Sequence, residues 1–254
     1  MTLCALGSRM LPLSVTLSCA ALAQAPDATV QLAPVFSNHM VLQRGAPICV
    51  WGTAPADAQV EVSWDDLRRV GAADSAGRWQ VTLPAQEASF EGRQLRAKLV
   101  GGDRGDRNAQ DTAVDVLVGD VWLCTGQSNM RWQVDQSAEA ADTLEQPAVR
   151  GLRLLDLRGR LYPDGTRYGL DFLRQLDADN YYETEGWARA DREAVASFSA
   201  VAFAFGRRLA RTLKVPVGLV HTAIGGAPME AFVPADGTPW MRGDAYPQWP
   251  AWDR

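Results

Sequence analysis

Short apolar runs alternate with turn-forming residues over residues 30–118 of the chain. Each run has the length of a strand, and Gly, Pro, Asp and Ser separate one run from the next. Strands at this spacing predict a small β-sandwich, which we place at residues 30–115. The predicted strands include Ile48–Trp51, Val60–Trp64, Trp79–Leu83, Leu95–Val100 and Ala113–Val118.

The period changes at Val116, where a longer apolar run continues to Cys124. Apolar positions at helical spacing then predict a helix over Ala196–Leu213, and Pro216 stops it. A buried strand follows at Val217–His221. The order of strand, helix and strand predicts an α/β fold with a parallel sheet over residues 116–254. Between these elements we expect a short helix at Val134–Leu144, a strand at Val149–Leu157 and a long loop at Arg158–Gly186.

The N-terminus has the pattern of a targeting segment. Arg9 precedes an apolar stretch, Met10–Ala20, and Ala21-Leu22-Ala23 supplies a site for cleavage before Gln24. The stretch is short for a bilayer span, so a signal peptide at residues 1–23 is favoured over a membrane anchor. The mature protein is then expected to be soluble, without a membrane contact, and exported to the periplasm or the medium.

Composition narrows the classes of function. The 254 residues include 47% hydrophobic residues and carry a net charge of −5, which argues against a nucleic-acid-binding protein. Two cysteines remain after cleavage, Cys49 and Cys124, and both lie in strand-like runs, so we expect free thiols rather than a disulfide. The sequence has no Cys/His spacing for zinc and no Gly-rich phosphate loop, so neither a metal nor a cofactor is expected.

The strongest candidate for chemistry is the turn that ends the run Val116–Cys124. Ser128 follows a strand end, where open α/β sheets place their sites. Gly126 permits positive φ or a close backbone approach, and Gln127 and Asn129 bring amide groups beside the hydroxyl. This arrangement suits a nucleophile with oxyanion donors, although the four residues Gly-Gln-Ser-Asn by themselves also fit a simple turn.

A second strand end lies at His221, ahead of the pair Gly225 and Gly226. These residues fit a strand, a turn and a helix start, or a second donor of backbone N–H groups to the same oxyanion. A serine nucleophile needs a base, and the chain has two histidines. Convergence of the two strand ends favours His221 as that base, whereas His39, in a turn-like string, suits a surface or interdomain role.

The residues from Gly119 to Met130 resemble the first block of the sialate O-acetylesterase family, which belongs to the SGNH-type hydrolases. The resemblance implies that Ser128 is the nucleophile and that its backbone N–H is an oxyanion donor. The matching residues are Trp122, Leu123, Cys124, Gly126, Gln127, Ser128, Asn129 and Met130, with Thr125 at a small-hydroxyl position.

The family's second block resembles the residues around Gly225. Gly225, Gly226, Pro228, Glu230 and Ala231 match it, whereas Ile224 and Ala227 depart from its Trp and Thr. The resemblance implies that a backbone N–H of this turn, which we assign to Gly226, completes the oxyanion hole. It implies a structural or substrate-positioning role for Glu230.

The resemblance covers residues 32 to 232. The family takes its base from an Asp-x-x-His block, preceded by a Gln-Gly-Glu-like block, and neither occurs in this sequence. We therefore expect an N-terminal part of such an enzyme, or a truncated or divergent member. Its SGNH-hydrolase-like parallel sheet is then incomplete, with an exposed edge strand and low stability.

These observations together predict an exported carbohydrate O-acetylesterase that acts on an O-acetylated sugar or glycan. O-acetylated sialate is the favoured substrate. A xylan or other polysaccharide acetylesterase is the near alternative. A non-catalytic glycan-binding protein or an inactive fragment is the other reading, because tryptophans are frequent and the family's base is absent.

Overall fold

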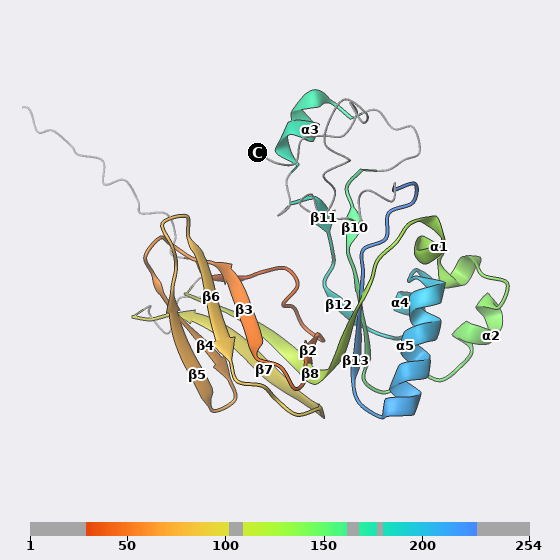
Figure 1. Ribbon diagram of the computed structural model, residues 1–254, viewed down its shortest axis with the longest axis horizontal. Helices are drawn as coiled ribbons and strands as arrows, with labels where there is room; N and C mark the ends of the chain where they lie inside the picture. The colour runs from red at the N-terminus through yellow and green to blue at the C-terminus, as the bar shows by residue number, and fades with distance from the viewer. Residues whose placement is uncertain (1–28, 102–108, 162–167, 177–179, 228–254) are drawn as a thin grey trace, which may run out of the picture.

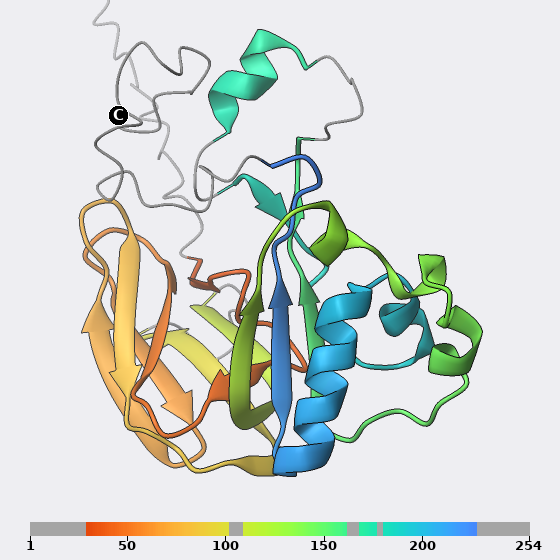
Figure 2. The same cartoon turned by 45° about the vertical axis from the view of Figure 1, so that its right-hand side comes forward.

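The structure is a computed structural model that describes residues 29–101, 109–161, 168–176 and 180–227 (Figures 1 and 2). A three-stranded antiparallel sheet contains β1 (Gln31–Leu32), β3 (Ile48–Thr53) and β6 (Arg78–Leu83). A larger sheet runs in the order β12-β9-β13-β8-β7-β4-β5, with β2 beside β8. Its strands are β2 (Val41–Gln43), β4 (Gln59–Trp64), β5 (Leu67–Ala72), β7 (Ser89–Leu99), β8 (Gln110–Cys124), β9 (Leu152–Asp156), β12 (Trp187–Arg189) and β13 (Val217–His221).

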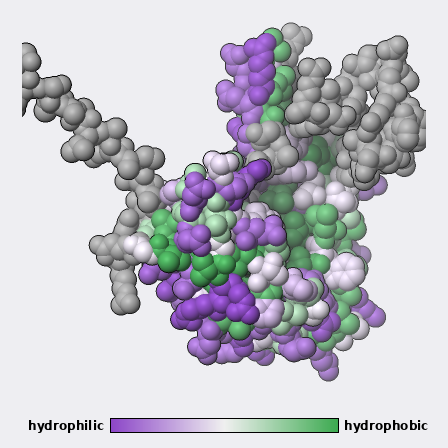
Figure 3. All heavy atoms as spheres, turned by 60° about the vertical axis from the view of Figure 1, so that its left-hand side comes forward, coloured by the Kyte–Doolittle hydropathy of each residue, from purple (hydrophilic) through white to green (hydrophobic). Residues whose placement is uncertain are grey.

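The predicted sandwich strands are all present, and in β3, β4 and β6 every second side chain faces the interior. In β4, Val60, Val62 and Trp64 are completely buried. β5 was missed by the sequence analysis because most of its residues are exposed and it has no apolar alternation. On the face shown in Figure 3, polar residues surround smaller apolar patches.

A single strand, β8, runs through the boundary that the sequence analysis placed between residues 115 and 116. Its first part pairs with β7 in antiparallel fashion, and Asp120–Cys124 pairs with β13 in parallel fashion. Asp115 has a φ of +56° at a register irregularity inside the part that pairs with β7. The change of pairing partner comes later in the same strand, between Val118 and Asp120.

Asp115 also joins the sandwich to the parallel strands through two arginines and a histidine. Its carboxylate accepts from Arg189 at 2.7 Å and from Arg153 at 3.2 Å, and it lies 2.8 Å from His39 Nδ1. Burial alone would raise the pKa of this carboxyl, but the bonds to His39 and Arg189 and the charge of Arg153 outweigh it, so the pKa is lowered. His39 thus has the interdomain position that the sequence suggested.

The parallel part of the sheet agrees with the prediction: β13 lies between β8 and β9 and is parallel to both. Helix α5 (Ala200–Leu213) covers one face of these strands (Figure 2). Its buried residues Ala202 and Phe203 belong to the same apolar cluster as Leu219 of β13. The Ser199 hydroxyl caps the helix by accepting from Ala202 N at 3.1 Å, and Lys214 ends it with a φ of +55°.

Three predicted elements differ in detail from the structure. The helix expected from Ala196 is split by residues 197–199 into α4 (Arg192–Ala196) and α5, because Asp191 and Ser199 each cap a helix. Val134–Leu144 forms two short pieces, η2 (Val134–Gln136) and α2 (Ala140–Leu144). The expected loop from 158 to 186 contains β10 (Arg158–Gly159), α3 (Leu170–Gln175) and β11 (Tyr182–Glu183) in its described parts.

The outer edge of the parallel sheet is open next to the predicted site. β2 pairs with β8 only as far as Gly119, and the Gln43 side chain then accepts from Val121 N at 2.9 Å. Within the described ranges, no strand pairs with β8 beyond that point on this side. Leu123, at this edge, is 66% exposed. This is the exposed edge that the sequence analysis expected.

Two further expectations concern cysteines and the N-terminus. Cys49 and Cys124 are both free thiols, as predicted. The predicted signal peptide lies outside the described residues. Across the part of the chain that the structure describes, no helix has the length and apolar character needed to cross a membrane.

Candidate functional site

Ser128 begins the short helix α1 (Ser128–Arg131), and three residues separate it from the end of β8 at Cys124. Gly126 has a φ of +153°, a conformation that side-chain-bearing residues rarely adopt. A Cβ atom at this position would lie 3.0 Å from Met130 Cβ. The glycine therefore lets the chain turn sharply from strand to helix, and Ser128 is exposed at the tip of that turn.

The Gly225–Gly226 turn lies directly beside the serine turn, as predicted from the sequence. Two backbone hydrogen bonds join the segments: Thr222 N donates to Cys124 O and Ile224 N donates to Gly126 O, both at 3.1 Å. Gly226 has a φ of +77° and forms the turn that Ala227 N closes on Ile224 O. Backbone N–H groups of two adjacent turns can stabilise an oxyanion when they converge on it.

The strand end at His221 forms a pair that the sequence analysis did not find. His221 Nδ1 lies 2.7 Å from Asp156 Oδ1, at the end of the neighbouring strand β9. In the sheet register His221 is level with Asp156 on one side and with Cys124 on the other. The available signal was that Asp156 follows the strand-like segment Leu152-Arg153-Leu154-Leu155. Parallel pairing places it level with His221, and the sequence alone does not reveal this register.

The surroundings of the pair favour an ionised carboxylate. Burial raises the pKa of Asp156, but hydrogen bonds from His221 and Arg158 and their charges outweigh it, so the pKa lies below its ordinary value. Arg158 Nε donates to the other carboxylate oxygen at 2.8 Å. Burial raises the pKa of the Cys124 thiol, which therefore stays protonated at neutral pH.

The remaining predicted residues take several positions. Gln127 occupies the cap position of α1 without a capping bond from its side chain, and both it and Asn129 are exposed. His39 pairs with Asp115 at the sandwich junction and does not join the serine turn. Glu230 lies outside the described residues.

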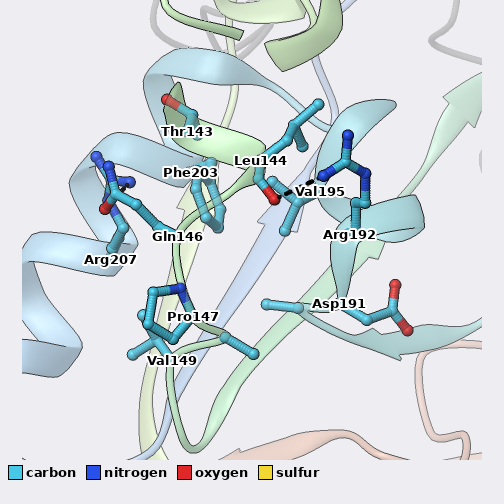
Figure 4. A pocket seen from close by; sticks show the side chains of 12 residues that line it. Thr143, Leu144, Gln146, Pro147, Val149, Asp191, Arg192, Val195, Phe203 and Arg207 are labelled. Carbon is cyan, nitrogen blue, oxygen red and sulfur yellow. Dashed lines mark hydrogen bonds between the residues drawn. The ribbon is translucent and has the colours of Figure 1, made fainter. Parts of the chain in front are cut away.

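Two pockets lie on the helix-bearing side of the molecule. The smaller, of about 40 Å³, is lined by Leu144, Val195 and Phe203 among others, with Arg192 donating to Leu144 O (Figure 4). The larger, of about 610 Å³, contains Asp156 and Phe198 in its wall. Neither of these two pockets is lined by Ser128, Gly225 or Gly226. No group of three acidic, His or Cys side chains within the described ranges could hold a metal ion.

Comparisons with known proteins confirm the resemblance inferred from the two blocks. The chain is 30% identical over 213 residues to the mouse sialate O-acetylesterase and 29% identical over 219 residues to the human one. It is also similar to the crystal structure of a carbohydrate acetylesterase from Xanthomonas citri, with a TM-score of 0.65 and 30% identity over 82% of this chain. No family model matches the chain.

These similarities cover most of this chain but a minor part of each relative. The matches span 80% of the chain and 37% of the mouse or 38% of the human protein. The chain corresponds to 43% of the Xanthomonas citri acetylesterase. The α/β fold with its preceding sandwich is thus shared with a carbohydrate acetylesterase, over the part that the chain spans.

Proposed function

We propose that this chain, a relative of the sialate O-acetylesterases, hydrolyses acetyl esters on carbohydrates with Ser128 as the nucleophile. The observation that carries the proposal is the hydrogen-bonded contact between the serine turn and the Gly225–Gly226 turn. This contact brings two strand ends with exposed backbone donors beside one accessible hydroxyl. The chain differs from the family's second block at Ile224 and Ala227. The proposal uses only backbone groups of this turn, so these side-chain differences do not affect it.

In this reaction Ser128 Oγ attacks the acetyl carbonyl carbon. The N–H groups of Ser128 and Gly226 receive the negative charge that develops on the carbonyl oxygen. The sugar oxygen leaves as the acetyl group is transferred to Ser128, and water then releases acetate. Oxyanion donors of this type contribute about 10²- to 10³-fold to the rate each.

The proposed substrate is an O-acetylated sialic acid, since the curated relatives are sialate O-acetylesterases. An acetylated xylan or another acetylated polysaccharide is the near alternative, because the solved relative is a carbohydrate acetylesterase. We also propose export after cleavage behind Ala23, which N-terminal sequencing of periplasmic or secreted protein would test by finding Gln24 first.

A test of the function measures acetate release from 4-nitrophenyl acetate, O-acetylated sialic acid and acetylated xylan. Ser128→Ala should abolish turnover and leave the unfolding midpoint unchanged, because Ser128 is exposed. Ser75→Ala, at an exposed turn of the sandwich, is the matched control and should keep full activity. Equal turnover by Ser128→Ala and the wild type would refute the proposal.

The alternative of a glycan-binding protein has one observation in its favour. Trp122 and Trp132 flank the serine turn and are 43% and 54% exposed. Exposed aromatic rings stack on sugar rings. Glycan affinity that depends on these tryptophans, with no Ser128-dependent hydrolysis, would support binding in place of catalysis.

A further inference from the structure

His221 has one ring nitrogen with a partner and one without. Nδ1 meets Asp156 at 2.7 Å, whereas Nε2 is buried and, among the described residues, has no hydrogen-bond partner. An ionised Asp156 carboxylate can only accept, so the proton of this bond is on Nδ1, and the imidazole in its neutral form presents an acceptor at Nε2. A buried polar atom without a partner is destabilising, so it calls for an explanation.

The direction of the ring is set by the sheet. β13 lies between β9, which carries Asp156, and β8, which leads to the serine turn. The two nitrogens of an imidazole point in widely divergent directions, so the bond to Asp156 turns Nε2 away from β9. The order across the three strand ends is therefore carboxylate, imidazole and serine turn, which is the order of groups in a serine hydrolase.

The other histidine of the chain is unsuited to this task. His39 donates its backbone N–H to Val114 O, and Val114 precedes Cys124 on β8 by ten residues. At the rise of an extended strand this separation is about 30 Å. His39 is therefore remote from the serine turn, and only His221 among the two has a carboxylate partner at the same edge of the sheet.

We propose that His221 Nε2 is the base that takes the proton of Ser128 and that Asp156 is the residue that positions it. The proposal rests on the proposed function and names the base that a serine nucleophile needs. Asp156 acts through His221 by holding the proton on Nδ1 and by stabilising the imidazolium that forms.

The step balances without any further reactant. As Ser128 Oγ bonds to the acetyl carbon, its proton passes to Nε2 and the carbonyl electrons move to oxygen. The intermediate then collapses: the bond from the acetyl carbon to the sugar oxygen breaks, and the imidazolium returns the proton to that oxygen. Water repeats the sequence on the acetyl-serine, with its proton passing through Nε2 to the Ser128 oxygen, and acetate leaves.

The serine must approach Nε2, since no hydrogen bond joins them in the described structure. α1 has four residues and none of them is buried. Met130 packs against the apolar cluster beneath α5, so the approach of Ser128 to His221 is a local adjustment of the turn around this contact. Catalytic hydrogen bonds of unliganded enzymes are often formed only when substrate is bound.

Cys124 is the competing partner for Nε2, because it is level with His221 in the register and is also buried. Its thiol is protonated and is a weak donor. A bond from this thiol would satisfy Nε2 and leave Ser128 without a base. Cys124→Ala separates the two possibilities, since it removes the competitor and leaves the proposed relay intact.

The test uses the full chain and measures the rate at which a fluorophosphonate labels Ser128, together with kcat and KM for 4-nitrophenyl acetate. His221→Asn keeps an N–H donor near the Nδ1 position and removes Nε2. It should slow labelling and lower kcat by about 10²- to 10⁴-fold with little change in KM. His39→Asn is the matched control, because His39 also meets a carboxylate through Nδ1, at 2.8 Å, and it should label at the wild-type rate.

Two more variants test the assigned roles. Asp156→Asn should lower kcat and leave KM unchanged, and Asp156→Glu should recover part of the loss. Cys124→Ala should retain labelling. If His221→Asn labels as fast as His39→Asn, the inference is overturned while the role of Ser128 stands. If the wild-type chain shows no labelling that Ser128→Ala removes, the proposed function itself fails and the base falls with it.

A measurement on the unsubstituted chain covers the case in which His221→Asn fails to fold. The chain has two histidines, so ¹⁵N-histidine labelling gives a spectrum in which each ring can be assigned. Reaction of Ser128 with the fluorophosphonate should move the Nε2 signal of His221 and leave that of His39 in place. An unchanged His221 signal would overturn the inference.

Discussion

The backbone at Gly126 sets the position of Ser128, and replacing this glycine tests the geometry of the site. In Gly126→Ala the new Cβ meets two obstacles. The φ of +153° is a conformation essentially restricted to glycine, which costs about 1–3 kcal/mol for another residue. The methyl group would also lie 3.0 Å from Met130 Cβ, inside the usual separation of about 3.5–4.0 Å between carbon atoms.

Gly45→Ala provides a matched control for this substitution. Gly45 has a φ of +68°, and an added Cβ would meet no atom within 4 Å. Gly45→Ala should therefore lower the free energy of unfolding by about 1 kcal/mol, which is the cost of the left-handed conformation alone. Adding the contact with Met130, we expect Gly126→Ala to cost about 3 kcal/mol. For a chain of this length these values lower the unfolding midpoint by about 2–4 °C for Gly45→Ala and about 6–12 °C for Gly126→Ala.

The assay combines thermal unfolding with the rate of fluorophosphonate labelling at Ser128. If α1 moves to relieve the contact, the loss of stability shrinks and the loss of labelling grows, because the serine has then moved. Gly45→Ala should label at the wild-type rate in either case. A Gly126→Ala protein that matches Gly45→Ala in both measurements would refute the claim that this glycine positions the nucleophile.

Three further predictions follow from the packing and the charges. Leu219→Ala, at a completely buried position beneath α5, should lower the free energy of urea unfolding by about 2–5 kcal/mol, and a loss below 1 kcal/mol would contradict the packing. Asp115→Asn, which leaves Arg153 and Arg189 without their shared carboxylate, should cost about 3 kcal/mol in the same assay, whereas exposed Asp171→Asn should cost almost nothing. Asp156 and Asp115 have lower pKa values in the folded protein than in the unfolded chain. They therefore add to the free energy of unfolding above the pKa of an unfolded carboxyl, and this contribution is lost as the pH falls through their pKa in the folded protein. Unfolding midpoints measured downward from pH 6 should therefore fall less in Asp115→Asn than in the wild type, and parallel curves would contradict this.

The sequence predicted elements well where one physical signal dominates. Alternation predicted β4, and the helical period followed by Pro216 predicted the end of α5. It failed where a side chain overrides the period: the hydroxyl of Ser199 starts a new helix inside a continuous apolar pattern. The sequence also did not reveal that β8 continues unbroken through residues 115 and 116 and exchanges β7 for β13 as its partner between Val118 and Asp120.

The candidate site likewise has residues that the sequence could reveal and one that it could not. Ser128 and the Gly-Gly turn could be found because each has a local pattern: an apolar run that ends in small and polar residues. Asp156 has no such pattern, and its role depends on the register that places it beside His221. Strand register is a property of the assembled sheet, set here by the pairing of β9 and β13 from Val217 to His221.

Among related chains, the source of the base can vary more freely than the proposed oxyanion donors. The oxyanion donors are backbone groups, held by bonds from Thr222 N and Ile224 N to the carbonyls of Cys124 and Gly126. Such bonds do not depend on the side chains at 224 and 227, so departures there leave the donors in place. A base, in contrast, must be a side chain, and any strand end that reaches the serine turn can supply it. His221 and Asp156 lie paired at two neighbouring strand ends of the sheet that carries the serine, which is why we propose them as the proton relay.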